Sequence, residues 1–271
     1  MADDDRAHEL TPAIVPAELR QDGIHDVVLE RGFVRVADLA DAFGVSTVTV
    51  RSDLQSLERR GALRRVRGGA VAGTSVHVEQ PFEVAQQDLA LEKARIGAYA
   101  AELVSDGDTV ILDVGTTTTA IGRALLARQR LRDVTIFTNA LNIAVDMERA
   151  ADRFQVVVTG GTLRPLQHSL VNPLGTLLLE RVHATLAFIG CNGVDVSAGA
   201  TNINLPEAEI KRAMLLAARR PVLVADASKL GEVELAKICD VGEASLLVTS
   251  GTADPHIVRD LERTGIEVAI A

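Results

Sequence analysis

A short stretch rich in arginine could bind an anionic partner. Residues 46–70 contain two carboxylates, Asp53 and Glu58, and the arginines Arg51, Arg59, Arg60, Arg64, Arg65 and Arg67. The local charge is +4, whereas the whole chain of 271 residues has a formal net charge of −9. Because a basic patch directs binding more than the total charge does, the stretch favours a polyanion as partner. Arginines that follow a helix also occur on solvated faces, so no single arginine decides between the two interpretations.

A second motif, VGTTTTAIG at residues 114–122, could bind phosphate. A buried apolar run precedes it and a helical pattern follows it. Gly115 allows a tight turn, and the threonines supply hydroxyls beside the free N–H groups of a helix start, which favour anions. The motif matches neither a Walker lysine motif nor G-x-G-x-x-G, so it does not indicate an NTP or a dinucleotide. The alternative is that the threonines simply cap the helix.

The residues around the arginines predict a helix-turn-helix with a wing. Apolar residues recur at helical spacing from Ala17 to Gly32, and again in a short helix that Gly44 closes. After a three-residue turn, Ser46 has the position of an N-cap and a third helix follows. Residues 62–73 then predict two short strands around a glycine turn. This order of elements is typical of a DNA-binding helix-turn-helix, whose last helix enters the major groove.

The third helix has one apolar face. Burying Val50, Leu54 and Leu57 turns the residues around Arg51 outward at 100° per residue. Wing arginines usually contact the DNA backbone or an adjacent minor groove. The predicted DNA contacts are Ser46, Thr47, Val48, Thr49, Arg51, Ser52, Gln55, Arg64, Arg65 and Arg67.

The second half of the chain predicts an α/β fold with a mostly parallel sheet. Short β-branched apolar runs alternate with helical patterns, which is typical of a parallel sheet covered on both faces. There are seven such runs, at residues 109–115, 134–140, 154–161, 185–193, 221–226, 245–250 and 266–271.

Polar or small residues follow several of the predicted strands, where open α/β sheets bind ligands. They are Asp113, Thr138, Asn139, Gly160, Gly161, Asn192, Gly193, Asp226, Ser228 and Lys229, and Glu207 and Lys211 begin a later helix. Asp113 and Asn139 could bind sugar hydroxyls or cap loops. Lys229 could supply a point charge to a phosphate or be an ordinary surface lysine.

Composition restricts the class of protein. The chain is 47% hydrophobic and 24% charged, and no apolar run approaches the ~20 residues that span a bilayer. The N-terminus has no hydrophobic signal region, and two cysteines, Cys191 and Cys239, cannot form a disulfide framework. We expect a cytoplasmic protein with no membrane partner. The histidines show no metal-ligand spacing, so neither a metal nor a cofactor is expected.

The basic region resembles the winged helix-turn-helix of DeoR-type bacterial transcription regulators. In this family V-S-x-x-T-V-R-x-D-L leads to a glycine and an arginine-rich G-G-A wing, as residues 45–71 do here. The chain departs from the pattern at Ser52, where the family usually has a second arginine. The resemblance implies a regulator, expected to be a repressor, that binds double-stranded operator DNA.

The second half is similar to the effector domain of the same family. The matching pieces are LDVGTTT, TNALNIA, VTGGTLR, GATNINLPEAEIKRAM and VLVADASK, in the same order. The resemblance implies a fold related to ribose-5-phosphate isomerase that senses phosphorylated sugars or related metabolites. It implies as pocket residues Asp113, Gly115, Thr116, Thr117, Thr138, Asn139, Gly161, Glu207, Lys211 and Lys229, to which the loop motif adds Thr118 and the strand ends add Gly160.

Two other classes of function stay open. A sugar-phosphate isomerase fused to a DNA-binding domain would need a carboxylate base, for which Asp195 and Glu207 are the candidates. Turnover would consume the signal, so we expect a sensor with no catalytic residues; Cys191 is expected to be a small buried residue. A domain that only forms oligomers is the third class, and it would show no response to ligand.

The predicted organisation has four parts. Residues 1–16 form a flexible tail, 17–74 the DNA-binding domain, 75–95 a linker and 96–271 the effector domain. One recognition helix reads few base pairs and gains affinity when two are linked, so a homo-oligomer, dimer or tetramer, is expected.

Overall fold

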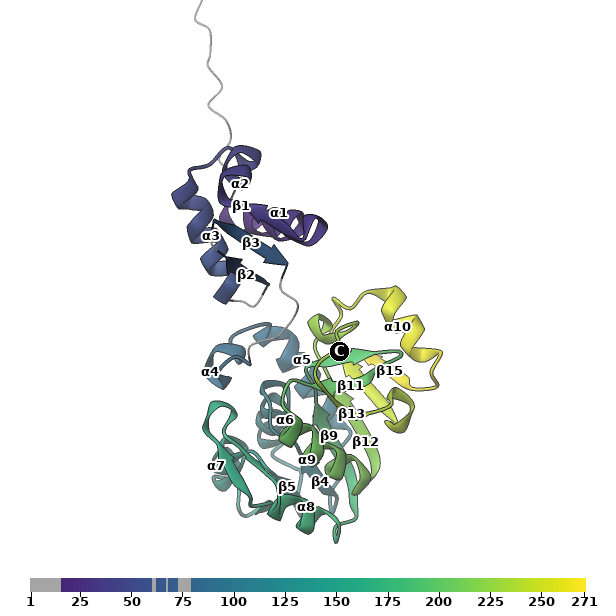
Figure 1. Ribbon diagram of the computed structural model, residues 1–271. Coiled ribbons are helices and arrows are strands. Elements are labelled where there is room, and N and C mark those ends of the chain that lie inside the picture. The colour runs from purple at the N-terminus through teal and green to yellow at the C-terminus, as the bar shows by residue number, and fades with distance from the viewer. Residues whose placement is uncertain (1–15, 60–61, 67, 73–78) are drawn as a thin grey trace, which may run out of the picture. The chain divides into compact units, whose positions relative to one another are not determined.

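The computed structural model describes residues 16–59, 62–66, 68–72 and 79–271 (Figure 1). The chain divides into two compact units, Met1–Val78 and Glu79–Ala271. Among the described residues, no helix has both the length and the apolar character needed to cross a membrane.

The first unit is a three-helix domain with a small antiparallel sheet. Its elements are α1 (Ala17–Arg31), β1 (Phe33–Arg35), α2 (Val36–Phe43), α3 (Thr47–Arg59), β2 (Leu63–Val66) and β3 (Gly69–Ala72), with the strand order β1-β3-β2. The predicted helices, three-residue turn and wing are thereby confirmed. Both predicted stops are glycines with positive φ, Gly32 at +70° and Gly44 at +62°, a conformation that glycine adopts without steric cost.

A single hydrophobic cluster holds this unit together. Its buried members are Ile24, Val28, Val34, Leu39, Ala40, Val50, Leu54, Leu57, Leu63 and Ala70. The predicted inward face of α3, formed by Val50, Leu54 and Leu57, is confirmed, because all three side chains are buried against α1, α2 and the wing.

The second unit is built on a seven-stranded parallel sheet, as the seven apolar runs predicted. The strands are β4 (Thr109–Leu112), β5 (Val134–Thr138), β6 (Phe154–Val158), β9 (Ala184–Gly190), β12 (Ala218–Val224), β14 (Leu246–Thr249) and β15 (Glu267–Ile270). Their order is β15-β14-β12-β9-β4-β5-β6. The order reverses beside β4. The chain proceeds from β4 through β5 to β6 on one side, and then crosses over to β9 on the other side of β4. Ligands of open α/β sheets bind at the carboxyl ends of the strands at such a reversal.

Helices cover both faces of this sheet. One cluster joins the strands to α5 (Ala90–Glu102), α6 (Thr116–Ala127) and α7 (Leu141–Glu148). The opposite cluster joins them to α8 (Leu174–Leu179), α9 (Leu205–Leu216) and α10 (Pro255–Glu262). Successive residues of β9 alternate between the clusters, since Leu186 and Phe188 belong to the first and Ala187 and Ile189 to the second. This alternation explains why the central strands read as continuous apolar runs.

Two small antiparallel sheets were not predicted. A hairpin of β7 (Thr162–Arg164) and β8 (Ser169–Val171) encloses the short helix η1 (Pro165–Gln167). Strands β10 (Gly193–Asp195), β11 (Gly199–Asn202) and β13 (Ala236–Cys239) form the second sheet, and η2 (Ala227–Lys229) and η3 (Val241–Glu243) are single short turns.

The predicted linker, residues 75–95, contains helical structure. Helix α4 (Phe82–Ala85) and the first turns of α5, which begins at Ala90, lie within it, while 75–78 fall outside the described residues. The side chain of Phe82 is buried. A four-residue helix is too short to show a period in the sequence, so this docked segment could not be recognised from spacing alone.

Candidate functional site

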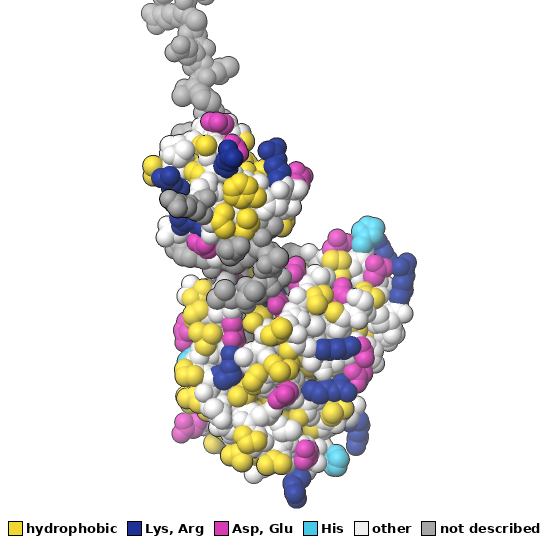
Figure 2. Space-filling model, in the orientation of Figure 1, with side chains coloured by type: hydrophobic (Ala, Val, Ile, Leu, Met, Phe, Trp, Pro, Cys, Tyr) yellow, Lys and Arg dark blue, Asp and Glu magenta, His cyan; other side chains and the backbone are white. Residues whose placement is uncertain are grey.

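The outward face of α3 presents the predicted DNA-contacting residues. Ser46, Thr47, Val48, Arg51, Ser52 and Gln55 are exposed, and Thr49 is half-buried. Val48, in the first turn of α3, is 72% exposed. Ser46 caps the helix as predicted, since the Thr49 amide donates to its Oγ at 3.1 Å. Figure 2 shows basic side chains over this helix.

A groove of about 270 Å³ connects this face to the wing. Its lining includes the start of α2 at Ala37, Thr47 and Arg51 of α3, and Arg65 of β2. Two helix N-termini and two guanidinium groups therefore border one concave surface, which suits a phosphate. Of the other predicted wing residues, Arg64 lies in β2, and Arg67 falls outside the described residues.

One acidic residue of the basic stretch is internal. The Asp53 carboxylate accepts hydrogen bonds from Arg20 Nε at 2.7 Å and from Gln21 Nε2 at 2.9 Å, both from α1. Arg20 and Asp53 are buried, and the hydrogen bond to Asp53 raises the pKa of Arg20. Asp53 therefore stabilises the fold rather than offsetting the charge of the outward face.

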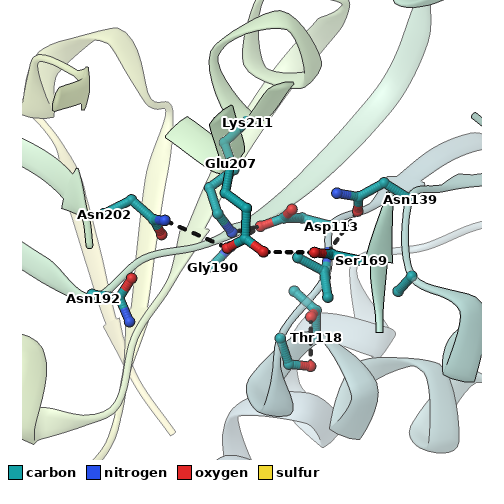
Figure 3. A network of polar contacts seen from close by, with 12 residues as sticks. Asp113, Thr118, Asn139, Ser169, Gly190, Asn192, Asn202, Glu207 and Lys211 are labelled. Atoms are coloured by element: carbon teal, nitrogen blue, oxygen red, sulfur yellow. Dashed lines mark hydrogen bonds and ion pairs between the residues drawn. The ribbon is translucent and has the colours of Figure 1, made fainter. Parts of the chain in front are cut away.

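The centre of the second candidate site is a buried ion pair at the reversal of strand order. Asp113 follows β4, and its Oδ2 accepts from the Gly190 amide at 3.0 Å and from Lys211 Nζ of α9 (Figure 3). Burial raises the pKa of Asp113 to about 6. Although burial alone would lower the pKa of Lys211, the carboxylates of Asp113 and Glu207 raise it above its usual value.

The second oxygen of Asp113 has no hydrogen-bond partner among the described residues. Its Oδ1 is buried and accepts no bond from the part of the chain that the structure describes. An unpaired buried acceptor costs on the order of 1–3 kcal/mol. A ligand hydroxyl placed there would remove this cost.

Glu207 stands beside this pair on α9. Its Oε1 accepts from Ser169 Oγ at 2.6 Å and from the Arg164 guanidinium, and Asn202 Nδ2 lies 3.5 Å from its Oε2 (Figure 3). The Asn204 side chain caps the helix by accepting from the Glu207 amide. None of Ser169, Arg164 and Asn202 was singled out in the sequence, since their elements are the short strands that spacing did not reveal.

The hydroxyls of the Gly-Thr loop fall into two groups. Thr118 and Thr119 donate to the Gly115 carbonyl at 2.9 and 2.7 Å. No side chain of the described residues accepts from the first amides of α6, so the alternative that the threonines cap the helix is not confirmed. The side chains of Thr116 and Thr117 form no hydrogen bond within the described residues. Gly115 has a φ of +142°, which favours glycine.

The side chains of Thr138 and Asn139 form hydrogen bonds to the backbone around the site. Asn139 Oδ1 accepts from the Val114 amide at 2.8 Å, and its Nδ2 donates to the Leu170 carbonyl. Thr138 Oγ1 accepts from the Ala140 amide. Both side chains are fully buried, and Asn139 positions the loop that follows β4 through its bond from the Val114 amide.

Gly160 and Gly161 follow β6 and have positive φ values of +73° and +123°. A Cβ at Gly161 would lie 2.0 Å from the Val171 carbonyl oxygen. The structure therefore requires glycine at 161 for close packing against β8.

Two lysines, Lys229 and Lys93, add positive charge to the second unit and interact electrostatically with each other. Lys229 is half-buried in η2 and has no ion pair with any described residue. Lys93, at the start of α5, donates to the carbonyls of Ala85 and Asp88 at 2.7 Å each. Burial lowers the pKa of Lys93. A cavity of about 310 Å³ is lined by residues that include Lys93, Thr116 and Arg123. Sequence reasoning missed Lys93 because it lies in the predicted linker.

The candidate groups for catalysis are occupied or protonated. Cys191, which was expected to be buried, is half-buried. Desolvation raises its pKa to about 12, so it is a thiol at neutral pH. The hydrogen bond from Ser197 lowers the pKa of Asp195, whose carboxylate also caps its own turn. Glu207 accepts from Arg164 and Ser169.

Two family models match the chain, one in each unit. The DeoR-like helix-turn-helix domain matches residues 20–76, and the DeoR C-terminal sensor domain matches residues 89–251.

The chain is similar to named regulators over almost its whole length. The HTH-type transcriptional regulator GlpR of Haloferax volcanii is 36% identical over 94% of this chain and 98% of its own. The putative aga operon transcriptional repressor of Escherichia coli is 32% identical over 93% of each chain. The glycerol-3-phosphate regulon repressor of Escherichia coli is 28% identical over 93% of this chain and 98% of its own.

Among solved structures, ribose 5-phosphate isomerase A of Methanocaldococcus jannaschii covers 51% of this chain and 52% of its own, with 17% identity and a TM-score of 0.38. A score this low carries no functional argument. The relatives above are named as regulators and repressors, which confirms the expectation of a regulator rather than an enzyme. With both family models matched in order, the chain belongs to the DeoR family of helix-turn-helix transcription regulators.

Proposed function

We propose that this regulator is a repressor that binds operator DNA through α3 and the wing, and that a phosphorylated sugar or related metabolite bound in the second unit controls this binding. The observation that carries the ligand site is the buried Asp113–Lys211 pair at the reversal of strand order, with Asp113 Oδ1 unpaired.

The DNA contacts rest on the exposed face of α3 and the adjoining groove. Arg51 and Arg65 border the groove together with two helix starts, and Val48 and Ser52 are exposed beside them. Arg51 is the residue with the reach for a bidentate contact to a base. Arg65, which also pairs with Glu58 at 3.8 Å, borders the groove beside the two helix starts, where a phosphate is favoured.

The ligand site divides into a polyol part and a phosphate part. Asp113 Oδ1 can accept from a sugar hydroxyl, and the Lys211 ammonium beside it balances the carboxylates. Thr116, Thr117 and the first amides of α6 can donate to a phosphate, and Lys229 adds charge. Gly160 and Gly161 shape the backbone beside the site, and Glu207 closes it.

Fluorescence anisotropy tests both operator binding and its control by ligand. The full chain is titrated at fixed salt onto DNA from upstream of its own gene, with and without a panel of sugar phosphates. Arg51→Ala should weaken operator binding by roughly 1–3 kcal/mol and leave ligand affinity unchanged. Lys229→Ala should weaken the response to ligand and leave operator affinity unchanged, so each variant serves as the control for the other. An equal ligand response in Lys229→Ala would remove Lys229 from the site.

The proposal includes an oligomer of this chain acting in the cytoplasm, where its DNA lies. Linking two recognition helices raises affinity through effective concentration, and sedimentation of the full chain tests it. A monomer at the concentration that saturates the operator would contradict this part.

A further inference from the structure

The second unit begins with a short segment held down by the β7–β8 hairpin. We name residues 79–85 the strap. Gln167 Nε2 donates to the Gln80 carbonyl at 2.7 Å, and the His168 ring lies edge-on to Phe82 with centroids 5.5 Å apart. His168 Nε2 also lies 2.7 Å from Glu83 Oε1. Three residues of the strap therefore contact one turn of the hairpin.

Arg164 of the hairpin holds the strap and the ligand site at once. Its guanidinium donates to both carboxylate oxygens of Glu79, at 2.5 and 3.3 Å, and to Glu207 Oε1. The side chains of Arg164 and Glu79 are 19% and 17% exposed, and that of Glu207 is 5% exposed. The Arg164 guanidinium therefore pairs with two carboxylates in a mostly buried environment, where charged hydrogen bonds are strong.

The hairpin itself is fastened to the site. Ser169 Oγ donates to Glu207, and the Leu170 carbonyl accepts from Asn139 Nδ2. The Leu141 amide donates to the His168 carbonyl. A displacement of Glu207 therefore changes the hydrogen bonds that two residues of the hairpin, Arg164 and Ser169, make to it.

We propose that Arg164 is the positioning residue that couples the ligand site to the strap, by dividing its guanidinium between Glu207 and Glu79. This inference rests on the proposed ligand site and specifies its regulation. In the sequence Glu79 is the first residue of the second unit, so the strap is the first part of that unit that the covalent connection reaches.

The physical basis is competition for one carboxylate. A ligand hydroxyl that donates to Glu207 replaces part of its bond to Arg164. The guanidinium then pairs more fully with Glu79, because a buried charge left with fewer partners is costly. The strap is held more tightly in the ligand-bound state, and a ligand shifts the equilibrium only through such a difference between states.

Hydrogen exchange of the full chain tests the contact without any ligand. The amides of Val84, Ala85 and Gln86 bond to carbonyls within the strap and report on its opening. Glu79→Gln should speed their exchange about ten-fold, the effect of losing a charged hydrogen bond. Glu180→Gln is the matched control, because Glu180 is exposed and has no ion pair with any described residue. Equal exchange in Glu79→Gln and wild type would overturn the proposal.

The same measurement with ligand tests the coupling. The probe is a mixture of glycerol 3-phosphate, glucose 6-phosphate, fructose 6-phosphate and ribose 5-phosphate, with binding followed by calorimetry. In wild type the mixture should slow exchange of the strap, and in Glu79→Gln it should bind but leave exchange unchanged. Binding to wild type without slower strap exchange would refute the coupling and leave the proposed function intact. No binding to wild type would refute the proposed ligand class, and this inference with it.

Arg164→Lys provides a second variant that keeps the charge. A lysine cannot hold two carboxylates in the planar manner of a guanidinium. Ligand should still bind this variant, while the ratio of operator affinities with and without ligand falls towards one, from the roughly 5- to 150-fold typical of such coupling. An undiminished ratio would show that Arg164 only stabilises the hairpin.

Discussion

Two carboxylates that the sequence places in different contexts are both buried in ion pairs. Asp53, counted among the charges of the basic stretch, is buried against Arg20, and Asp113, chosen for its place after a strand, is buried against Lys211. The place of Asp113 in the site could be predicted because strand ends meet at one edge of a sheet. The partner of Asp53 could not, since Arg20 is 33 residues away and only the tertiary fold joins them.

The titration of Asp113 should appear in the pH dependence of stability. Its pKa in the folded chain, about 6, lies above the ordinary value of 3.8 because the carboxyl is buried. The folded state therefore binds more protons than the unfolded state between these values, and stability falls as pH rises from about 4 to 6. Urea denaturation should show wild type losing on the order of 1–3 kcal/mol relative to Asp113→Asn across this window. Parallel pH profiles for the two proteins would contradict the raised pKa.

Asp53→Asn should destabilise the DNA-binding unit alone. It removes the charge from a buried pair that joins α3 to α1, which costs roughly 1.5–3 kcal/mol. Hydrogen exchange in α1 and α3 should accelerate, while exchange in the parallel sheet should not change. Asp41→Asn, at an exposed position of α2, is the control. An effect of equal size in Asp41→Asn would mean that net charge, not the ion pair, is responsible.

At the scale of elements, long periodic segments were predictable and short docked ones were not. The helices around Val50 and the seven parallel strands follow from spacing and from β-branched runs. The β7–β8 hairpin has only three residues in each strand, too few to display alternation. The Glu207 part of the site depends on that hairpin through Ser169 and Arg164, so it could not be assembled from the sequence.

Gly161→Ala should disrupt this hairpin. A methyl group there would meet the Val171 carbonyl oxygen at 2.0 Å, and the φ of +123° is unfavourable for alanine. Together the steric clash and the backbone strain should lower the free energy of unfolding of the second unit by on the order of 3 kcal/mol or more. Gly160→Ala, with φ +73° and open space to 3.8 Å, should cost only about 1–2 kcal/mol. Thermal denaturation of the sensor unit measures both, and equal losses would contradict the role given to the close contact with β8.

The whole molecule has separate hydrophobic cores in its two units. The core of the first unit lies within residues 24–70, and both clusters of the second lie within residues 96–271. Small domains bury a smaller fraction of their surface and are correspondingly marginal in stability. The division into units follows from the change of pattern along the sequence, from helical spacing to apolar runs.

Calorimetry of the full chain should therefore show two unfolding transitions. The transition at lower temperature should belong to the first unit, and Asp53→Asn should lower that transition while leaving the other in place. Ligand should raise only the upper transition, since binding stabilises the unit that holds the site. A single transition that both Asp53→Asn and ligand displace would show that the units unfold together.

Separate cores also bear on how regulators of this kind diversify. If α3 reads operator DNA and the region of Asp113 binds the ligand, as proposed, a substitution on the face of α3 changes which DNA sequence is read without disturbing the packing around the parallel sheet. A change near Asp113 leaves the core of the first unit untouched. After gene duplication, one copy can acquire a new set of target genes while its chemical signal stays the same, or keep its targets and answer to a new nutrient.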